Sequence, residues 1–406
     1  MQGGVKQRMV SDSVSAPETP PAPGTPPLWL HPQAAYVHVP FCAHHCCYCD
    51  FAVVAGKDHL ADRYLDSLAQ EMGVGLAHDV VHSIHIGGGT PTQLTLPQLE
   101  RLLRDLRNRF SLAEGAEFAI EANPNLLSDE KLALLAAHGI NRLSLGAQSF
   151  QPHLLQLLER QHQPAEIDDV VSRARRLIPN VSLDLIFGTP GQTLDQWHDD
   201  LQRVIDLGIS HVSTYGLTYE KGTQLWKRVQ RGLVLVQEEE SERELYALAM
   251  DTLTAAGFEQ YEISNFARPG FRSRHNQTYW ANEAYFGYGL GAARYIGGVR
   301  EVNTRDLEHY LRQASAGQSP TQQREELSPD ERARETAMLN LRRLEGIVRA
   351  QFQEQTGFDI ETLSGHAIAR NVEYGLLTAD EHHLALTREG KFLADSVCGD
   401  FLVPGV

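Results

Sequence analysis

The sequence has little cysteine, no long apolar run and no excess of positive charge. Five cysteines among 406 residues are too few for a disulfide scaffold, and the start lacks the pattern of a secretory signal. No stretch approaches the ~18 consecutive apolar residues of a membrane-spanning helix. The 52 acidic and 36 basic side chains give a net charge of −16, which argues against nucleic acid as the main partner. We therefore predict a cytoplasmic protein with reduced thiols, and leave peripheral contact with a membrane open.

Four of the five cysteines lie within residues 42–49, and Cys42, Cys46 and Cys49 have the spacing C-x3-C-x2-C. Clustered thiolates favour zinc or an iron–sulfur cluster. A structural zinc site usually needs a second cysteine pair, whereas Cys398 stands alone. A four-iron cluster held by three cysteines would leave one iron open to another ligand. From spacing alone, zinc and a redox-active pair remain alternatives. Cys47 could replace Cys46 in a second register of the same motif.

A regular alternation of strand and helix patterns follows a proline-rich leader at 1–33, which we predict to be disordered. Helical segments repeat apolar residues with a period of 3.6 and begin at capping residues such as Thr95, Ser128 and Thr193. The six strand-like segments between the helices are 35–39, 82–86, 117–121, 141–146, 181–187 and 211–217.

This alternation predicts a parallel α/β sheet with right-handed crossovers. Six units in about 190 residues fall short of the ~250 of an eight-unit barrel. We therefore predict a partial (β/α)6 barrel over 34–220, with a doubly wound sheet as the alternative. A barrel extension over 221–325 and a mainly helical domain over 326–406 complete the predicted organisation.

Unusual residues follow the predicted strands at their carboxyl ends, where parallel α/β folds gather ligands and catalytic groups. A glycine triplet is usually a turn and Glu121 usually a solvated strand end, but Asp184 lies between two leucines and needs a partner if buried. His38, His82 and His85 are more typical of core or rim histidines. The unusual segments are the cysteine loop, Gly87–Thr92, Glu121, Gln148, Asp184 and Tyr215.

The motifs together resemble the radical S-adenosylmethionine (SAM) superfamily. They are YVHVPFC, GGGTPT, EANP, LSLGAQSF, DLIFGTPGQT and HN-x2-YW. The sequences of these motifs are similar to those of the oxygen-independent coproporphyrinogen III oxidase branch, and within it to those of the haem chaperone family HemW. The similarity extends from about Tyr36 to Leu393.

This resemblance implies that the three cysteines hold a [4Fe–4S] cluster whose fourth iron binds SAM. It implies that Tyr36 and Tyr48 flank the cluster, and that Gly88, Gly89 and Thr90 meet the methionine end of SAM. By the same resemblance, the cofactor and substrate cavity is lined by Glu121, Gln148, Arg160 and Asp184.

The HN-x2-YW stretch contains His275, Tyr279 and Trp280, the element that the resemblance implies binds haem. A histidine beside aromatic rings can ligate haem iron, and the rings can stack on the macrocycle. From the residues alone, a hydrogen-bonded histidine in an aromatic cluster is the alternative. The C-terminal segment resembles the family's winged-helix-like domain. The acidic composition favours a lid or docking role for this domain over DNA binding.

One residue separates the two functions that the resemblance offers. The authentic oxidase has a fourth cysteine two places after the third, where this chain has Phe51. We therefore predict a haem chaperone that binds a [4Fe–4S] cluster, SAM and haem and delivers haem to apoproteins. The alternative is an oxygen-independent coproporphyrinogen III oxidase of porphyrin biosynthesis, and the sequence leaves enzymatic activity undecided.

Overall fold

The computed structural model describes residues 30–73, 75 and 78–403. Almost all of the predicted disordered leader therefore lies outside the described residues. No helix within the described ranges is long and apolar enough to cross a membrane.

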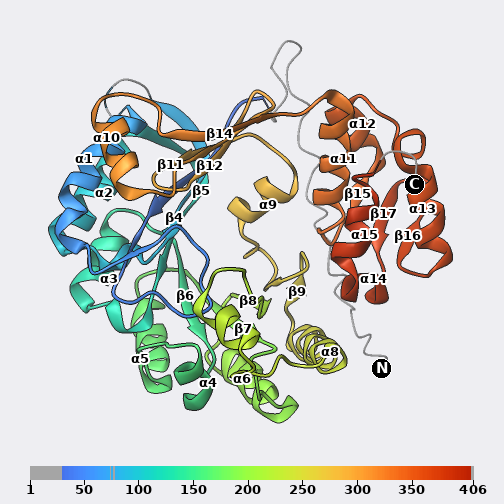
Figure 1. Cartoon of the computed structure of the whole chain (residues 1–406), viewed down its shortest axis with the longest axis horizontal. Helices are drawn as coiled ribbons and strands as arrows, with labels where there is room; N and C mark the ends of the chain where they lie inside the picture. Colours follow the sequence, from blue (N-terminus) through green and yellow to red (C-terminus); the bar gives the residue numbers. More distant parts are fainter. Residues whose placement is uncertain (1–29, 74, 76–77, 404–406) are drawn as a thin grey trace, which may run out of the picture.

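Six parallel strands form the predicted barrel, and each pairs with the next one along the chain. Their sequential order is that of a singly wound barrel, whereas a doubly wound sheet reverses its order at a switch point. Figure 1 shows the strands inside an arc of helices that is open towards α9 (Arg274–Trp280). The strands are β1 (Ala34–Val39), β4 (Asp79–Gly88), β5 (Phe110–Ala122), β6 (Arg142–Gln148), β7 (Asn180–Phe187) and β8 (His211–Gly216).

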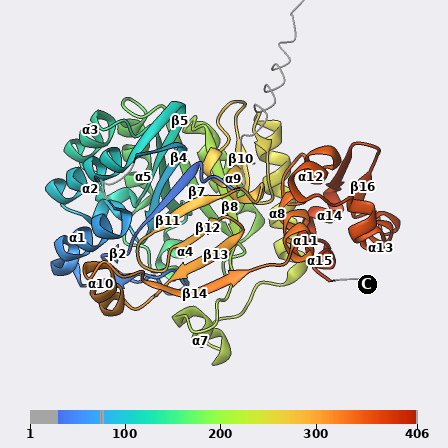
Figure 2. The same cartoon turned by 90° about the horizontal axis from the view of Figure 1, so that it is seen from above.

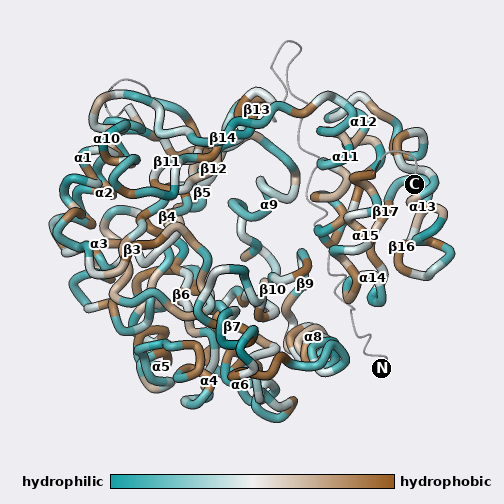
Figure 3. Tube along the Cα trace, viewed as in Figure 1, coloured by the Kyte–Doolittle hydropathy of each residue, from teal (hydrophilic) through white to brown (hydrophobic). Residues whose placement is uncertain are grey.

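The outer helices begin where the sequence predicts them. Thr95 and Thr193 each form a capping box with the glutamine three residues later, and Ser128 caps the third helix. Brown and teal segments alternate along these helices in Figure 3, as expected when one face of each packs on the sheet. They are α1 (Ala61–Met72), α2 (Leu96–Arg109), α3 (Asp129–Ala137), α4 (Pro152–Leu157), α5 (Pro164–Ala174) and α6 (Leu194–Asp206).

The extension adds strands to both edges of the barrel sheet, which has 12 strands in the described part of the chain. One group continues from β1, with β11 parallel to it and the next three antiparallel. This group is β11 (Tyr285–Tyr288), β12 (Ala293–Ile296), β13 (Val299–Asn303) and β14 (Thr321–Glu326). At the other edge, β10 (Asn265–Ala267) and β9 (Glu259–Gln260) follow β8.

Three further helices belong to the extension, in addition to α9. Figure 2 shows α7 projecting below the sheet and α10 beside α1 at its edge. The helices are α7 (Gln224–Gln230), α8 (Glu239–Ala255) and α10 (Leu307–Ser315). Two short strands in the cysteine loop, β2 (Phe41–Cys42) and β3 (Val54–Ala55), pair with each other. Short 3-10 turns occupy Asp58–Leu60, Pro91–Gln93 and Pro124–Leu126.

The C-terminal domain has its own apolar core, built around Phe352, Leu384 and Phe401. Figure 1 shows it on the far side of α9 from the barrel. Its helices pack around one three-stranded antiparallel sheet, in agreement with the predicted winged-helix-like character. The elements are α11 (Pro329–Asn340), β15 (Ile347–Val348), α12 (Arg349–Thr356), α13 (Ile360–Glu373), β16 (Leu377–Ala379), β17 (His383–Leu386), α14 (Arg388–Phe392) and α15 (Ala394–Asp400).

Candidate functional site

Two adjoining cavities lie at the carboxyl ends of the barrel strands, as the sequence predicts. The smaller one, of about 520 Å³, contains the cysteine loop, and we name it the cysteine cavity. The larger one, of about 1040 Å³, extends between the barrel, α9 and α10. Six residues line both cavities, so the two spaces meet. They are Asp50, Phe51, Gly88, Glu121, Asp184 and Tyr215.

Cys42, Cys46 and Cys49 all line the cysteine cavity as free, partly buried thiols. Cys47 instead packs into a separate apolar cluster and donates its Sγ–H to the carbonyl oxygen of Leu157, 3.4 Å away. This placement favours the predicted C-x3-C-x2-C register over the alternative through Cys47.

Burial makes the ionised form of two of the three thiols costly unless a positive centre lies beside the sulfur. Burial raises the pKa of Cys42 to about 11 and also raises the pKa of Cys49, so ionised sulfur needs a positive partner there. Arg160 Nη1 lies 3.5 Å from Cys46 Sγ, and Thr90 Oγ1 lies 3.7 Å from Cys42 Sγ. No three His, Cys, Asp or Glu side chains in the described ranges lie in an arrangement that could hold a single metal ion.

Glycines let the backbone come close to the cavity after β4. Gly88 has a φ of +106°, and a Cβ there would lie 2.4 Å from the His38 ring. A Cβ on Gly89 would lie 2.7 Å from the Pro40 carbonyl group. Since neither position has room for a side chain, the loop can meet a ligand only with backbone groups and Thr90.

Glu121 ends β5 beside this loop. Its Oε2 accepts from Gly88 N at 3.0 Å, and its Oε1 lies 2.9 Å from His85 Nε2. Burial opposes ionisation of Glu121, but the His85 and Gly88 hydrogen bonds outweigh it and lower the pKa of the carboxyl. The cavity therefore presents a fixed negative charge where the two spaces meet.

Arg160 holds the opposite wall of the cysteine cavity. Its Nη2 donates to the carbonyl oxygen of Gly146 at 2.8 Å and also to Asn123, whose Nδ2 donates to Thr90 Oγ1 at 3.0 Å. Gln148 lies beside Arg160 with a φ of +66°, a conformation that non-glycine residues rarely adopt. Tyr48 lines the same wall, and its burial raises the pKa of the phenol while Arg160 opposes the rise.

Asp184 has the partner that its buried position requires. Ser144 Oγ lies 3.1 Å from each carboxylate oxygen, and Ser213 forms another hydrogen bond. Burial is nevertheless the dominant influence and raises the pKa of Asp184 to about 6.

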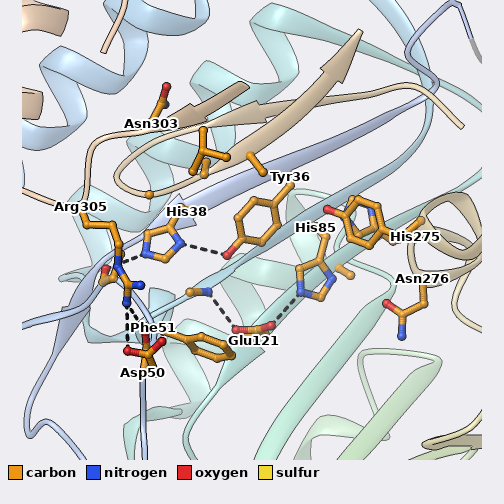
Figure 4. A pocket seen from close by; sticks show the side chains of 18 of the residues that line it. Tyr36, His38, Asp50, Phe51, His85, Glu121, His275, Asn276, Asn303 and Arg305 are labelled. Carbon is orange, nitrogen blue, oxygen red and sulfur yellow. Dashed lines mark hydrogen bonds and ion pairs between the residues drawn. The ribbon is translucent and has the colours of Figure 1, made fainter. Parts of the chain in front are cut away.

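A network of rings forms the floor of the larger cavity (Figure 4). The Tyr36 hydroxyl lies 3.0 Å from His38 Nδ1, and His38 Nε2 donates to the carbonyl oxygen of Ala52 at 2.9 Å. Burial lowers the pKa of His38 to about 4, so its ring is neutral at pH 7. The His85 ring stacks against both Tyr36 and His275, with centroids at 6.1 and 5.1 Å, and the Tyr36 and His275 centroids lie 6.4 Å apart.

The HN-x2-YW residues occupy α9, between the barrel and the C-terminal domain. His275 Nδ1 lies 3.1 Å from Ser83 Oγ and its Nε2 lies 2.8 Å from the Tyr279 hydroxyl, so both ring nitrogens are engaged. His275 and Tyr279 line the larger cavity. Trp280 lines neither cavity and lies under the Arg342 guanidinium, 5.2 Å from its ring centroid.

Most of the predicted site residues line the cysteine cavity. All three cysteines and every predicted cofactor residue except Tyr36 line the cysteine cavity, while Tyr36 lines only the larger one. The predicted site residues did not include Asn123, although it lies in the EANP motif, or His38 and His85, which were interpreted as core or rim histidines. A signal for His38 was present, because it follows Tyr36 by two residues and therefore shares its face of β1.

Comparisons with known proteins agree with this geometry. Residues 36–204 match the radical SAM superfamily and residues 327–393 match the HemN C-terminal domain. The heme chaperone HemW of Bacillus subtilis is 39% identical over 91% of this chain and 99% of its own length. The heme chaperone HemW of Escherichia coli is 32% identical over 92% and 99%. The bovine mitochondrial radical S-adenosyl methionine domain-containing protein 1 is 34% identical over 97% and 91%.

Among solved structures, the coproporphyrinogen III oxidase HemN of Escherichia coli, described as a radical SAM enzyme, superposes with a TM-score of 0.81. It is 25% identical, and the match covers 92% of this chain and 91% of that one. The similarity therefore includes the barrel, its extension and the C-terminal domain.

Proposed function

Since the chain belongs to the HemW family of the radical SAM superfamily, we propose that it binds a [4Fe–4S] cluster, SAM and haem and delivers haem to apoproteins. The observation that carries this proposal is the junction of the two cavities. One has three cysteines that fit a cluster, and the other has the volume and aromatic lining suited to a macrocycle.

Different residues of the cysteine cavity would bind the cluster and SAM. Cys42, Cys46 and Cys49 would ligate three irons, and the bound cluster would supply one-electron chemistry at the sulfonium of SAM. Arg160 offsets the thiolate charge at Cys46. Because a side chain at Gly88 or Gly89 would clash with His38 or Pro40, this loop would offer backbone groups and Thr90 to the methionine end of SAM.

The larger cavity suits haem because a flat apolar ligand can contact rings on its walls. Phe51 is 66% exposed although it projects beside the cavity, so a bound macrocycle would cover an apolar ring that otherwise faces water. His275 and Tyr279 would form the α9 wall. Ligation of iron by His275 would require Nε2 to release the Tyr279 hydroxyl.

The rival function is that of a coproporphyrinogen III oxidase, which the likeness to HemN favours. Phe51 argues against it, because the oxidase pattern has a cysteine at this position. The recipients of haem would be apoproteins in the reducing cytoplasm, where free thiols persist.

Anaerobic reconstitution followed by haem titration tests the proposal. We expect a haem Soret band that saturates at one equivalent and haem transfer to an apo-globin acceptor. With coproporphyrinogen III, SAM and a reductant, we expect no protoporphyrinogen. Protoporphyrinogen formation, or absence of haem binding, would contradict the proposal.

Iron and sulfide analysis separates the cluster ligands from their neighbour. Substitutions Cys42→Ala, Cys46→Ala and Cys49→Ala should each abolish the content of ~4 irons. Cys47→Ala is the matched control, since its sulfur lies in an apolar cluster outside the cavity. Equal iron content in all four variants would disprove the assigned register.

A further inference from the structure

The edge of the larger cavity is basic, although the protein as a whole is strongly acidic. Arg305, His309 and Arg312 line this edge from α10 and the loop before it, and we name them the basic rim. All three residues are exposed. The protein's net charge is −16, so a local group of basic side chains is notable, although Asp50 and Asp306 also line the cavity beside them.

One of the arginines lining the cavity has no carboxylate partner. Arg142 pairs with Glu117 at 3.4 Å, and Arg305 pairs with Asp50 at 3.4 Å and with its carbonyl oxygen. Within the described residues, Arg312 makes no ion pair or side-chain hydrogen bond. The Arg312 guanidinium on the cavity edge can therefore bind an anionic group without breaking an existing ion pair.

Carboxylates near the rim do not compete for Arg312. Asp306 caps α10 by accepting from His309 N at 2.7 Å, and Glu308 lies 3.7 Å from Arg63. Asp50 pairs with Arg305. The remaining cavity carboxylates, Glu121 and Asp184, come from β5 and β7 and bond to groups on the barrel strands. The cavity therefore has a basic edge on α10 and an acidic side where it meets the cysteine cavity.

The rings lie between these regions of opposite charge. Figure 4 shows Arg305 and His275 at opposite sides of the cavity, with Tyr36 between them and Glu121 below. A ligand that is flat and apolar, with carboxylates along one edge, matches this distribution only when its carboxylates face α10. The reverse orientation would bring them towards Glu121 and Asp184, where like charges repel.

We infer that the basic rim binds the two propionate groups of haem and so fixes the orientation of the macrocycle in the cavity. This inference rests on the proposed haem function and adds the ligand group that is recognised. Arginine suits the role because its planar fork can donate two hydrogen bonds to one carboxylate.

The test compares iron-free protoporphyrin IX with its dimethyl ester, which retains the ring but lacks both charges. Each is titrated by absorbance into the reconstituted full-length protein, and haem binding is measured in parallel. We expect the wild-type protein to bind the diacid about 10-fold more tightly than the diester. Arg312→Gln should weaken diacid binding about 5-fold and leave diester binding unchanged. In the double variant Arg312→Gln with Arg305→Gln, the affinities for the diacid and the diester should become equal.

Arg104→Gln is the matched control, because Arg104 is exposed on α2, lines neither cavity and makes no ion pair in the described part of the chain. It should leave the ratio of diacid to diester affinity at the wild-type value. An unchanged ratio in both rim variants, with haem still bound, would overturn the inference and leave the proposed function standing. Failure of the wild-type protein to bind haem or either porphyrin would overturn both.

Discussion

At the scale of single residues, Asp184 shows how the barrel tolerates a carboxyl group inside a buried strand. Burial raises its pKa to about 6, while hydrogen bonds from Ser144 and Ser213 limit the rise. The folded protein therefore binds this proton more tightly than the unfolded chain, whose aspartates have a pKa of ~3.9. Stability from this site is complete below that value and is lost as the pH rises through about 6.

We predict that Asp184→Asn removes this pH dependence. Between pH 5 and pH 7 the wild-type free energy of unfolding should fall by about 1–2 kcal/mol relative to the variant. Chemical denaturation of both proteins across this range measures the difference. Glu130→Gln, an exposed carboxyl at the start of α3, is the control and should show no such relative fall. A constant difference between wild type and Asp184→Asn would contradict the raised pKa.

The sequence predicts the residues of the cysteine cavity well because each follows a strand at the same edge. Gly88, Glu121 and Asp184 come from different strands yet line one space. His85 could not be predicted in this way, because a histidine inside a strand has the same pattern whether it faces the core or a cavity. Its stacking on His275 depends on a contact between β4 and α9 that no local pattern records. The rim residue Arg312 is equally invisible, since most exposed arginines are solvated.

At the scale of elements, a single buried carboxylate fixes the position of α9. Glu117 accepts at 3.2 Å from Ser273 Oγ and from the backbone N–H groups of Arg274 and His275. These groups form the N-terminal end of the helix, where a negative charge is favourable. Glu117 therefore sets the position of the cavity wall that contains His275.

We predict that Glu117→Gln loosens α9 and also weakens the barrel locally, because buried Arg142 on β6 loses its carboxylate partner. Hydrogen exchange over 274–280 should accelerate by about 5- to 150-fold, because the loss of a charged acceptor costs ~1–3 kcal/mol. Glu114→Gln is the matched control, since it makes the same change at an exposed position of β5. Equal exchange rates in the two variants would show that the carboxylate does not hold the helix.

Element boundaries were predictable where apolar periodicity is strong and unpredictable in the extension. The six barrel strands and the capped helices α2, α3 and α6 overlap the predicted segments, although β5 already begins at Phe110, before the predicted 117–121. The strands β11–β14 were missed because their stability comes from pairing at the sheet edge. The clearest case is β14, whose sequence TQQREE has five exposed positions and no apolar alternation.

At the scale of the whole molecule, the C-terminal domain has an apolar core separate from the one that the barrel and the extension share, and polar contacts help to join the two parts. Arg300 on β13 forms two hydrogen bonds with Glu335 on α11, at 2.6 and 3.0 Å. Glu335 is only 13% exposed, and its Oε2 also lies 3.3 Å from Asn282 Nδ2 at the end of α9. Breaking the Arg300–Glu335 pair should weaken the association of the C-terminal domain with the extension more than it weakens either apolar core.

We predict that Glu335→Gln lowers the midpoint of C-terminal unfolding, at a cost of about 1–3 kcal/mol, because it leaves Arg300 partly buried without its main partner. Differential scanning calorimetry should resolve an earlier transition for the C-terminal core while the barrel transition stays in place. Glu325→Gln is the matched control, because Glu325 pairs with the same arginine at 3.2 Å but is 55% exposed. Its cost should stay below ~1 kcal/mol. If both variants unfold like the wild-type protein, the Arg300–Glu335 pair does not hold the domain, and apolar contacts around α9 must account for its docking.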